Sequence, residues 1–149
     1  MSATTTDADC GSSNGSISIA VGNGVAPYQY QLNTNPPQSS PDFTAAPGIY
    51  TITVTDVNGC EFSISKQVFS TTSYLLDIKP ILMGSCIITG CHNGSNSSLP
   101  NFSNLSTVQA NASMIKSRTQ SKNMPKTGSL TQGQIDLLAC WVDDGAKDN

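Results

Sequence analysis

Two cysteines and the only histidine of the chain lie close together, between Cys86 and His92. Four residues separate Cys86 from Cys91, and His92 follows the second thiol directly. Two thiols can add across the vinyl groups of a haem, and a histidine beside the second thiol can then bind the iron. The usual spacing has two residues between the cysteines, so the loop here is longer. The pattern predicts one covalently attached haem c, held by Cys86, Cys91 and His92.

Three other interpretations of this motif stay open at the level of sequence. Cys86 and Cys91 can form a disulfide, which leaves His92 as an ordinary surface residue. The same three side chains can bind zinc together with Cys140, although an adjacent cysteine and histidine suit one tetrahedral ion poorly. A catalytic Cys–His pair is disfavoured, because neighbours in sequence rarely face each other and no orienting carboxylate is indicated.

The composition favours an exported protein. The 149 residues include only 11% charged residues, and the net charge of −3 with a pI of about 4.7 disfavours a nucleic-acid partner. No apolar run is long enough for a membrane span, and the first residues do not have the pattern of a signal peptide. Because covalent haem attachment normally takes place outside the cytoplasm, we expect the periplasm, the cell surface or secretion. We also expect a mature protein or a fragment of a longer one.

The first half of the chain, from about residue 10 to residue 69, has the pattern of short β-strands. Apolar residues alternate with small polar ones around Ile17, Tyr30 and Ile52, and turn signals such as Asn58-Gly59 lie between these segments. Short alternating strands separated by turns predict a β-sandwich.

The five cysteines of the chain predict a set of cross-links. Cys10 precedes the first predicted strand and Cys60 follows the last hairpin turn, so we expect a disulfide between them, contributing roughly 3–4 kcal/mol. Two separate thiols are the alternative. With Cys86 and Cys91 on the haem, Cys140 stays alone, either as a small buried side chain or as a thiol that reacts with another molecule.

Four stretches of the first half, residues 15–19, 26–30, 48–56 and 58–60, resemble the SprB-type repeat of bacterial surface adhesins. The resemblance implies an all-β immunoglobulin-like sandwich, which we assign to residues 1–69. Such repeats usually occur in tandem, and one copy is found in this sequence.

Residues 70–74 are expected to be a short linker, after which the apolar spacing becomes helical. Leu75, Ile78 and Leu82 lie on one face of a predicted helix, which Pro80 either kinks or starts. Further predicted helices span residues 107–119 and a segment that opens at Thr131 and ends at Gly145. Residues 93–104 are predicted to be a loop. Trp141 is expected to pack the last helix against the helix of residues 75–83.

The second half resembles a class of small bacterial c-type cytochrome domains. The matching segments are residues 77–82, 86–92, 124–125, 130–131 and 141–146. The resemblance implies a monohaem, all-α cytochrome c-like domain over residues 75–149, in which the longer loop between the cysteines also occurs. The expected fold class is therefore an all-β immunoglobulin-like sandwich followed by an all-α cytochrome c-like domain.

Met124 is the expected second iron ligand opposite His92. The chain has no second histidine, and four methionines remain as candidates, of which Met1 is terminal. Met83 belongs to the helix on the His92 side, and Met114 lies inside a helix as an expected core residue. Met124 lies in a loop held extended by Pro125, and the resemblance points to the same residue. His92 and Met124 are thus the predicted metal ligands.

Two further sets of contacts are predicted around the haem. The carbonyl of Pro100 is expected to orient the imidazole of His92. Buried propionates need cationic or hydrogen-bonding partners, and the candidates are Arg118 first, with Lys116, Lys122 and Lys126.

The expected function is one-electron transfer rather than catalysis, because both axial positions of the iron are filled. Its partners would be redox proteins of unknown identity, and the sandwich would hold the haem at the cell surface or bind a partner. A haem enzyme (peroxidase-like) or gas sensor with an open sixth position is one alternative. A purely adhesive or structural surface module is the other. The sequence indicates no oligomeric state.

Overall fold

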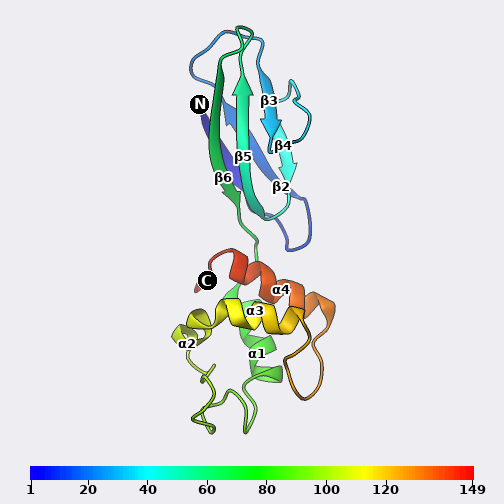
Figure 1. Ribbon diagram of the computed structural model, residues 1–149, viewed down its shortest axis with the longest axis vertical. Coiled ribbons are helices and arrows are strands. Elements are labelled where there is room, and N and C mark those ends of the chain that lie inside the picture. Colours follow the sequence, from blue (N-terminus) through cyan, green and yellow to red (C-terminus); the bar gives the residue numbers. More distant parts are fainter. The chain divides into compact units, whose positions relative to one another are not determined.

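The computed structural model describes residues 1–149 and divides them into two compact units, Met1–Thr71 and Thr72–Asn149 (Figure 1). The first unit contains every strand and the second every helix. The chain is 26% helical and 26% strand, with two small antiparallel sheets and four short α-helices. Four short helices do not make a clear all-α cytochrome c-like domain. The predicted fold class, an immunoglobulin-like sandwich followed by such a domain, is therefore wrong. Segments rich in Gly, Pro, Asn and Ser interrupt the second half and keep its helices short.

Six strands form the two sheets of the first unit. One sheet has the order β1 (Ser2–Thr6), β2 (Gly15–Ala20), β4 (Asp42–Ala45), and the other has the order β3 (Gln29–Leu32), β5 (Gly48–Thr55), β6 (Glu61–Val68). All neighbouring strands are antiparallel. The alternating pattern predicts β2, β3, β5 and β6. It does not indicate β1 or β4, because β1 is mostly Ser and Thr and β4 follows a proline.

The two sheets share one apolar core. Successive side chains of a strand point to opposite faces, so Ile17 and Ile19 of β2 point inward together, as do Ile52 and Val54 of β5. All four are buried. The remaining buried apolar residues of this core are Ala3, Ala8, Tyr30, Leu32, Ala45 and Val68. This burial fixes the register of the strands, since a shift by one residue would expose the inward set.

The turn between β5 and β6 is organised by Asp56. Its carboxylate accepts hydrogen bonds from the backbone N–H groups of Val25 (3.1 Å), Asn58 (2.9 Å) and Cys60 (2.9 Å). These bonds hold the pKa of Asp56 below its ordinary value, and the bond from Cys60 lowers it most. Gly59 adopts φ +81°, which a side chain would disfavour.

The predicted disulfide between Cys10 and Cys60 is wrong. Cys60 is an exposed free thiol, whereas Cys10 and Cys140 are both disulfide-bonded, so Cys140 is not the lone cysteine. Cys60 directly precedes β6, whereas Cys10 lies close to the Ala8–Ser70 bridge beyond the other end of that strand. The 8 residues of β6 span roughly 26 Å. A disulfide requires Cα atoms within about 7 Å.

The second unit begins with a single π-helical turn, η1 (Tyr74–Ile78), that leads directly into α1 (Lys79–Ser85). Ser73 caps this turn, since its hydroxyl accepts a hydrogen bond from Leu76 N. Pro80 lies in the first turn of α1, where the missing N–H has no helical partner to lose. The proline therefore marks the start of the α-helix, one of the two predicted outcomes.

The predicted helix over residues 107–119 is two helices, α2 (Leu105–Ala110) and α3 (Ala112–Gln120). The break falls at Asn111, whose side chain donates to the carbonyl of Thr107 at 2.8 Å. The last helix, α4 (Gln132–Asp143), begins with the predicted capping box of Thr131 and Gln134. Gly145 then adopts φ +93° beyond its end. No helix is long and apolar enough to cross a bilayer.

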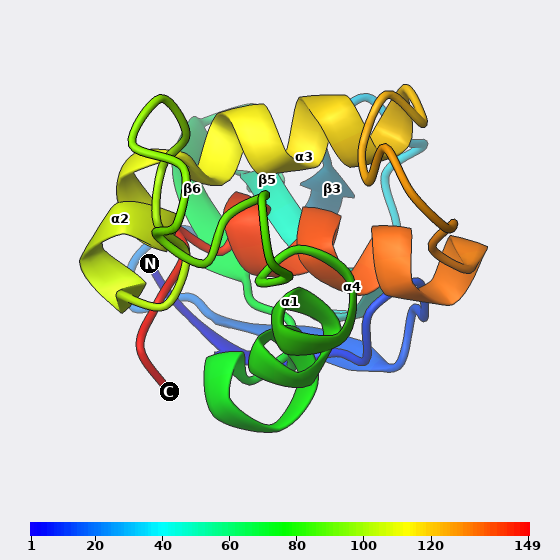
Figure 2. The same cartoon turned by 90° about the horizontal axis from the view of Figure 1, so that it is seen from below.

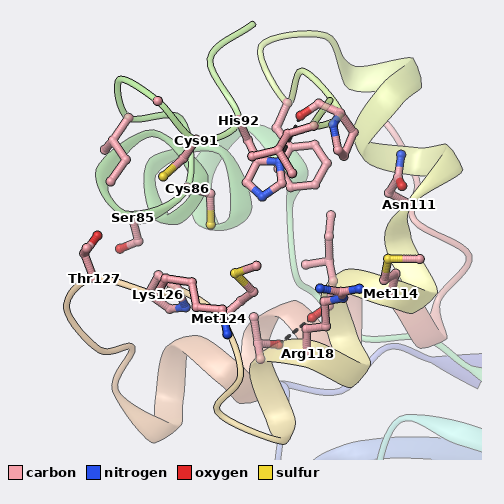
Figure 3. Close-up of a pocket in the computed structure, with 18 of the residues that line it drawn as sticks. Ser85, Cys86, Cys91, His92, Asn111, Met114, Arg118, Met124, Lys126 and Thr127 are labelled. Atoms are coloured by element: carbon pink, nitrogen blue, oxygen red, sulfur yellow. Dashed lines mark hydrogen bonds between the residues drawn. The ribbon is translucent and has the colours of Figure 1, made fainter. Parts of the chain in front are cut away.

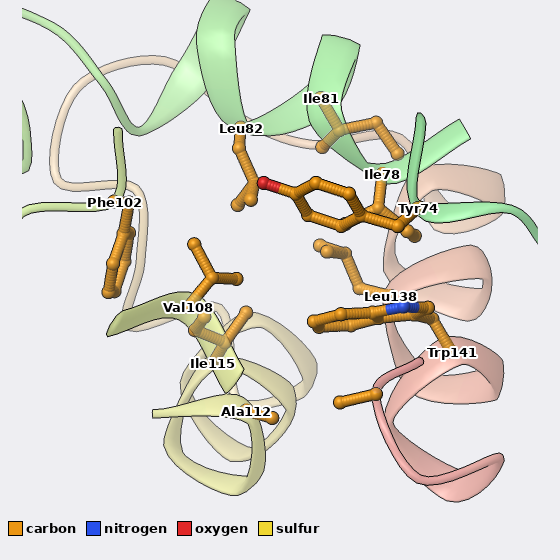
Figure 4. Close-up of a cluster of buried hydrophobic side chains, with 11 residues drawn as sticks. Tyr74, Ile78, Ile81, Leu82, Phe102, Val108, Ala112, Ile115, Leu138 and Trp141 are labelled. Carbon is orange, nitrogen blue, oxygen red and sulfur yellow. The ribbon is translucent and has the colours of Figure 1, made fainter. Parts of the chain in front are cut away.

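The second core lies between these helices. In Figure 2, α3 and α4 run side by side, and Figure 4 shows the rings of Tyr74 and Trp141 close to each other and to Leu138. The ring centroids of Tyr74 and Trp141 are 5.5 Å apart, and the indole N–H of Trp141 donates to the carbonyl of Lys147 at 2.8 Å. The predicted packing of the last helix against the first is thus confirmed. The buried set is Tyr74, Ile78, Ile81, Leu82, Phe102, Val108, Ala112, Ile115, Leu138, Trp141 and Ala146.

Asn149 binds the start of η1. Its amide donates to the carbonyl of Thr72 at 3.1 Å, and its side-chain oxygen accepts from Tyr74 N at 2.9 Å. Its backbone oxygen accepts from the hydroxyl of Ser73 at 2.7 Å and from Leu75 N at 3.2 Å. The first and last segments of the second unit are therefore fixed to each other.

Candidate functional site

A cavity of about 450 Å³ opens in the second unit (Figure 3). Its walls come from the end of α1 and the loop that follows, from α3, and from the loop that precedes α4. All five predicted site residues line it: Cys86, Cys91, His92, Arg118 and Met124. The side chains come from two stretches that are well separated in sequence, residues 86–92 and 118–124, and the fold brings them together.

The loop after α1 brings the two thiols and the imidazole to one wall. The N–H groups of Cys86 and Ile87 both bind the carbonyl of Leu82 at 2.8 Å, which closes the last turn of α1. The chain then reverses, and His92 N donates to the carbonyl of Cys86 at 3.1 Å. Gly90 permits this reversal, because it adopts φ +82°. The four residues between the cysteines thus form one tight loop.

The imidazole of His92 is fixed by the loop that follows. Its Nδ1 lies 2.9 Å from the carbonyl oxygen of Pro100, as the sequence predicts. A carbonyl oxygen only accepts, so Nδ1 carries the hydrogen and Nε2 keeps its lone pair. The ring also stacks on Phe102, with centroids 4.2 Å apart and planes inclined by 10°. His92 therefore presents Nε2, rather than Nδ1, in a defined orientation.

Phe102 is a residue that sequence reasoning misses. The loop of residues 93–104 is mostly polar, and Phe102 is the one aromatic residue in it. It is buried, and its N–H donates to the carbonyl of His92 at 2.8 Å. The sequence does hold one signal for its burial: Phe102 is an aromatic residue in an otherwise polar loop, two positions after Pro100.

Met124 approaches the cavity from the other side. Figure 3 shows its thioether and the imidazole of His92 pointing into the same space from opposite walls. The backbone of Met124 is tied to the end of α3, since its N–H donates to the carbonyl of Arg118 at 3.1 Å. Lys122 adopts φ +56° and turns the chain back toward the cavity. The peptide bond between Met124 and Pro125 is cis.

The prediction that Met114 is a core residue is wrong. Its side chain is 52% exposed and lines the cavity. The buried face of α3 is formed by Ala112, Ile115 and Thr119, which recur at helical spacing. Met114 lies one residue, about 100° around the helix, from Ile115 and faces away from the core.

The cavity is lined by neutral and cationic side chains. Of the four predicted cations, Arg118 and Lys126 line it, whereas Lys116 forms an ion pair with Asp143. Residues 79–135 contain no Asp or Glu, and this range includes every residue of the cavity lining. The local charge therefore favours an anionic group.

The thiol of Cys86 is poorly suited to be a nucleophile. Burial, together with the neighbouring Cys91, raises its pKa to about 11. The thiolate is the nucleophilic form, so little of it exists near neutral pH. His92 is bound to Pro100 rather than to a carboxylate, which agrees with the argument against a catalytic Cys–His pair.

The states of the cysteines bear on the two structural alternatives for the motif, a Cys86–Cys91 disulfide and a zinc site that includes Cys140. Cys86 and Cys91 are both free thiols and do not form a disulfide with each other. Cys140 is disulfide-bonded, so it offers no thiolate for a zinc site with His92 and the two motif cysteines. An imidazole nitrogen and a thioether sulfur on facing walls are ligands typical of a transition metal.

Comparison with known proteins concerns the first unit. Residues 2–37 match the SprB repeat, which confirms the resemblance over a segment that includes β1, β2 and β3. This match is shorter than half of the chain. It suggests a cell-surface or extracellular protein. Searches of curated proteins and of solved structures found no match. The resemblance of the second half to c-type cytochromes stays a prediction.

Proposed function

We propose that the second unit binds one haem c covalently and carries single electrons at the cell surface or outside the cell. The observation that supports this best is the convergence of two free thiols, an oriented imidazole and a thioether on one cavity. Each of these groups has a distinct task in holding a haem.

The dimensions and lining of the cavity fit such a group. Its volume of about 450 Å³ is within the range of about 300–1,000 Å³ found for cofactor pockets. Apolar side chains such as Ile88, Leu99 and Ile115 line it and offer contact to a flat macrocycle. Arg118 and Lys126 are the basic residues of its lining, and they suit two carboxylates that need cationic partners.

The residues divide the work of holding the group. Cys86 and Cys91 would form the two thioether bonds, and Nε2 of His92 and the sulfur of Met124 would bind the iron. When bound, the haem supplies one-electron exchange between Fe(III) and Fe(II). The carbonyl of Pro100 keeps a hydrogen on Nδ1 of His92, so that Nε2 is the nitrogen that would bind the iron.

The test is expression of the full chain in a host that matures c-type cytochromes. We expect a coloured protein whose haem remains attached after denaturation, and a digest in which the peptide carrying Cys86 and Cys91 has gained the mass of haem. The double variant C86A/C91A should lose the covalent haem, whereas Cys60→Ala should keep it. A colourless protein, or a disulfide between Cys86 and Cys91, would contradict the proposal.

A second candidate function rests on the match of residues 2–37 to the SprB repeat. This match favours an adhesive or structural surface module more directly than it favours electron transfer. If adhesion is the main function, the haem-free C86A/C91A variant should bind cell surfaces as well as the parent chain does. If the first unit only holds the haem at the surface, neither protein should show such binding.

A further inference from the structure

We propose that Phe102 is a positioning residue that sets the plane of the His92 imidazole relative to the haem. This inference rests on the proposed function of the cavity. Its basis is the stack of the two rings, with centroids 4.2 Å apart and planes inclined by only 10°.

The hydrogen bond to Pro100 does not fix the ring plane by itself. It holds Nδ1 at 2.9 Å from the carbonyl oxygen, but an N–H···O bond weakens steeply only when its angle falls below about 120°, roughly 60° from linearity. The imidazole could therefore tilt about this contact at little cost. A second, extended contact on the face of the ring removes that freedom, and Phe102 provides it.

Phe102 can act in this way because it is itself held rigidly. It is only 6% exposed, and it belongs to the buried cluster that contains Val108 and Ile115. Its N–H donates to the carbonyl of His92 at 2.8 Å, so the backbones of the two residues are also joined. The orientation of the iron ligand is thereby coupled to the hydrophobic core of the second unit.

The consequence concerns the electronic structure of the site. In oxidised low-spin haem proteins the plane of an axial imidazole directs the unpaired spin into particular macrocycle positions. The hyperfine-shifted NMR signals of the four haem methyl groups report that plane together with the orientation of the opposite ligand. Core packing alone does not set this pattern, so the pattern separates positioning from stability.

The experiment uses the mature full chain, after mass spectrometry has established haem on the peptide with Cys86 and Cys91. In the reduced protein we expect nuclear Overhauser contacts between the ring protons of Phe102 and His92. In the oxidised protein, Phe102→Leu should redistribute the haem methyl shifts, and Phe102→Tyr, which keeps an aromatic face, should restore the parent pattern. Val108→Ala is the matched core control, and it should lower stability without changing the pattern.

The outcomes are distinct. Attached haem with no ring-to-ring contact in the parent, or with the same methyl pattern in Phe102→Leu, would overturn the role of Phe102 and leave the proposed function intact. A redistribution of equal size in Val108→Ala would also overturn it. Absence of haem from the peptide would overturn the proposed function, and the positioning role with it.

Discussion

Nδ1 of His92 and the carbonyl oxygen of Pro100 are hydrogen-bonded at 2.9 Å, across a loop that begins directly after the histidine. The conformation of this loop decides where the carbonyl lies. Asn101, next to Pro100, packs so closely on Gly94 that a Cβ at Gly94 would lie 2.7 Å from its amide nitrogen. The side chain of Asn101 also accepts from Ser103 N at 3.0 Å, so moving aside would break this hydrogen bond.

Gly94→Ala is therefore expected to displace Pro100 and loosen His92. Gly94 has φ +87° and Gly128 has φ +77°, but a Cβ at Gly128 meets no atom within 4 Å. Gly128→Ala should thus lower the free energy of unfolding by about 1–2 kcal/mol through backbone strain alone. Gly94→Ala should cost more and should also weaken iron ligation. Thermal unfolding and visible spectra of both variants test this, and equal effects of the two would contradict the assigned contact.

Met124 is expected to be the sixth ligand of the iron. A thioether stabilises Fe(II) relative to Fe(III) more than a nitrogen donor does, so Met124→His should lower the reduction potential. Met124→Ala should open the site and let the reduced form bind carbon monoxide. Redox titration and carbon monoxide binding measure these effects.

Met114→Leu is the matched control, because Met114 lines the same cavity but belongs to α3. It should leave both properties nearly unchanged. If Met124→Ala keeps the potential and carbon monoxide binding of the parent while Met114→Leu changes them, the iron ligand is Met114 of α3 rather than Met124. Rapid carbon monoxide binding by the parent would favour the enzyme or sensor alternative.

Cys86 should react slowly with alkylating reagents in the haem-free chain. Burial raises its pKa from 9.0 to about 11, which lowers the thiolate fraction at pH 8 about 100-fold relative to an ordinary thiol. Its labelling rate should rise about tenfold for each pH unit up to that value. Timed labelling followed by peptide mass analysis is the measurement. Exposed Cys60 is the internal control and should be modified first.

Asp56 should make the stability of the first unit depend on pH. Its pKa is below the ordinary value of 3.8 in the folded chain, so the folded state prefers the ionised form. This contribution is fully present above the ordinary pKa and is lost as the pH falls through the lowered one. Melting of the full chain between about pH 5 and pH 2 tests this. The stability difference between the parent and Asp56→Asn should shrink as the pH falls, and a difference that stays constant over this range would contradict the contribution of Asp56.

Sequence patterns predict those helices and strands whose apolar residues all lie on the face toward the core. The alternation of Ile17 with Ile19, and of Ile52 with Val54, marks two central strands because each pair faces the core. Thr131 and Gln134 predict the start of α4, because a capping box is a local interaction that the sequence shows directly. The convergence of Met124 on the cavity of His92 follows a resemblance rather than any local rule.

What escapes the sequence depends on contacts between distant residues. The separation of Cys10 from Cys60 is fixed by the length of β6, which no local pattern measures. The break at Asn111 rests on a side-chain bond to Thr107, within a stretch whose apolar spacing continues across it. Met114 and Phe102 are misjudged or missed because the face of α3 and the fold of a polar loop are tertiary properties.

The four hydrogen bonds of Asn149 have a practical consequence for protein engineering. They hold Asn149 against Ser73 and Tyr74, so the two ends of residues 72–149 lie side by side. A unit with adjoining ends can be inserted into a surface loop of another scaffold, or circularly permuted, with little strain. The haem-binding segment lies in the interior of that sequence, so a graft of residues 72–149 would carry the whole lining of the cavity. Cys140 is disulfide-bonded in the full chain, so the graft would need this cysteine replaced by serine.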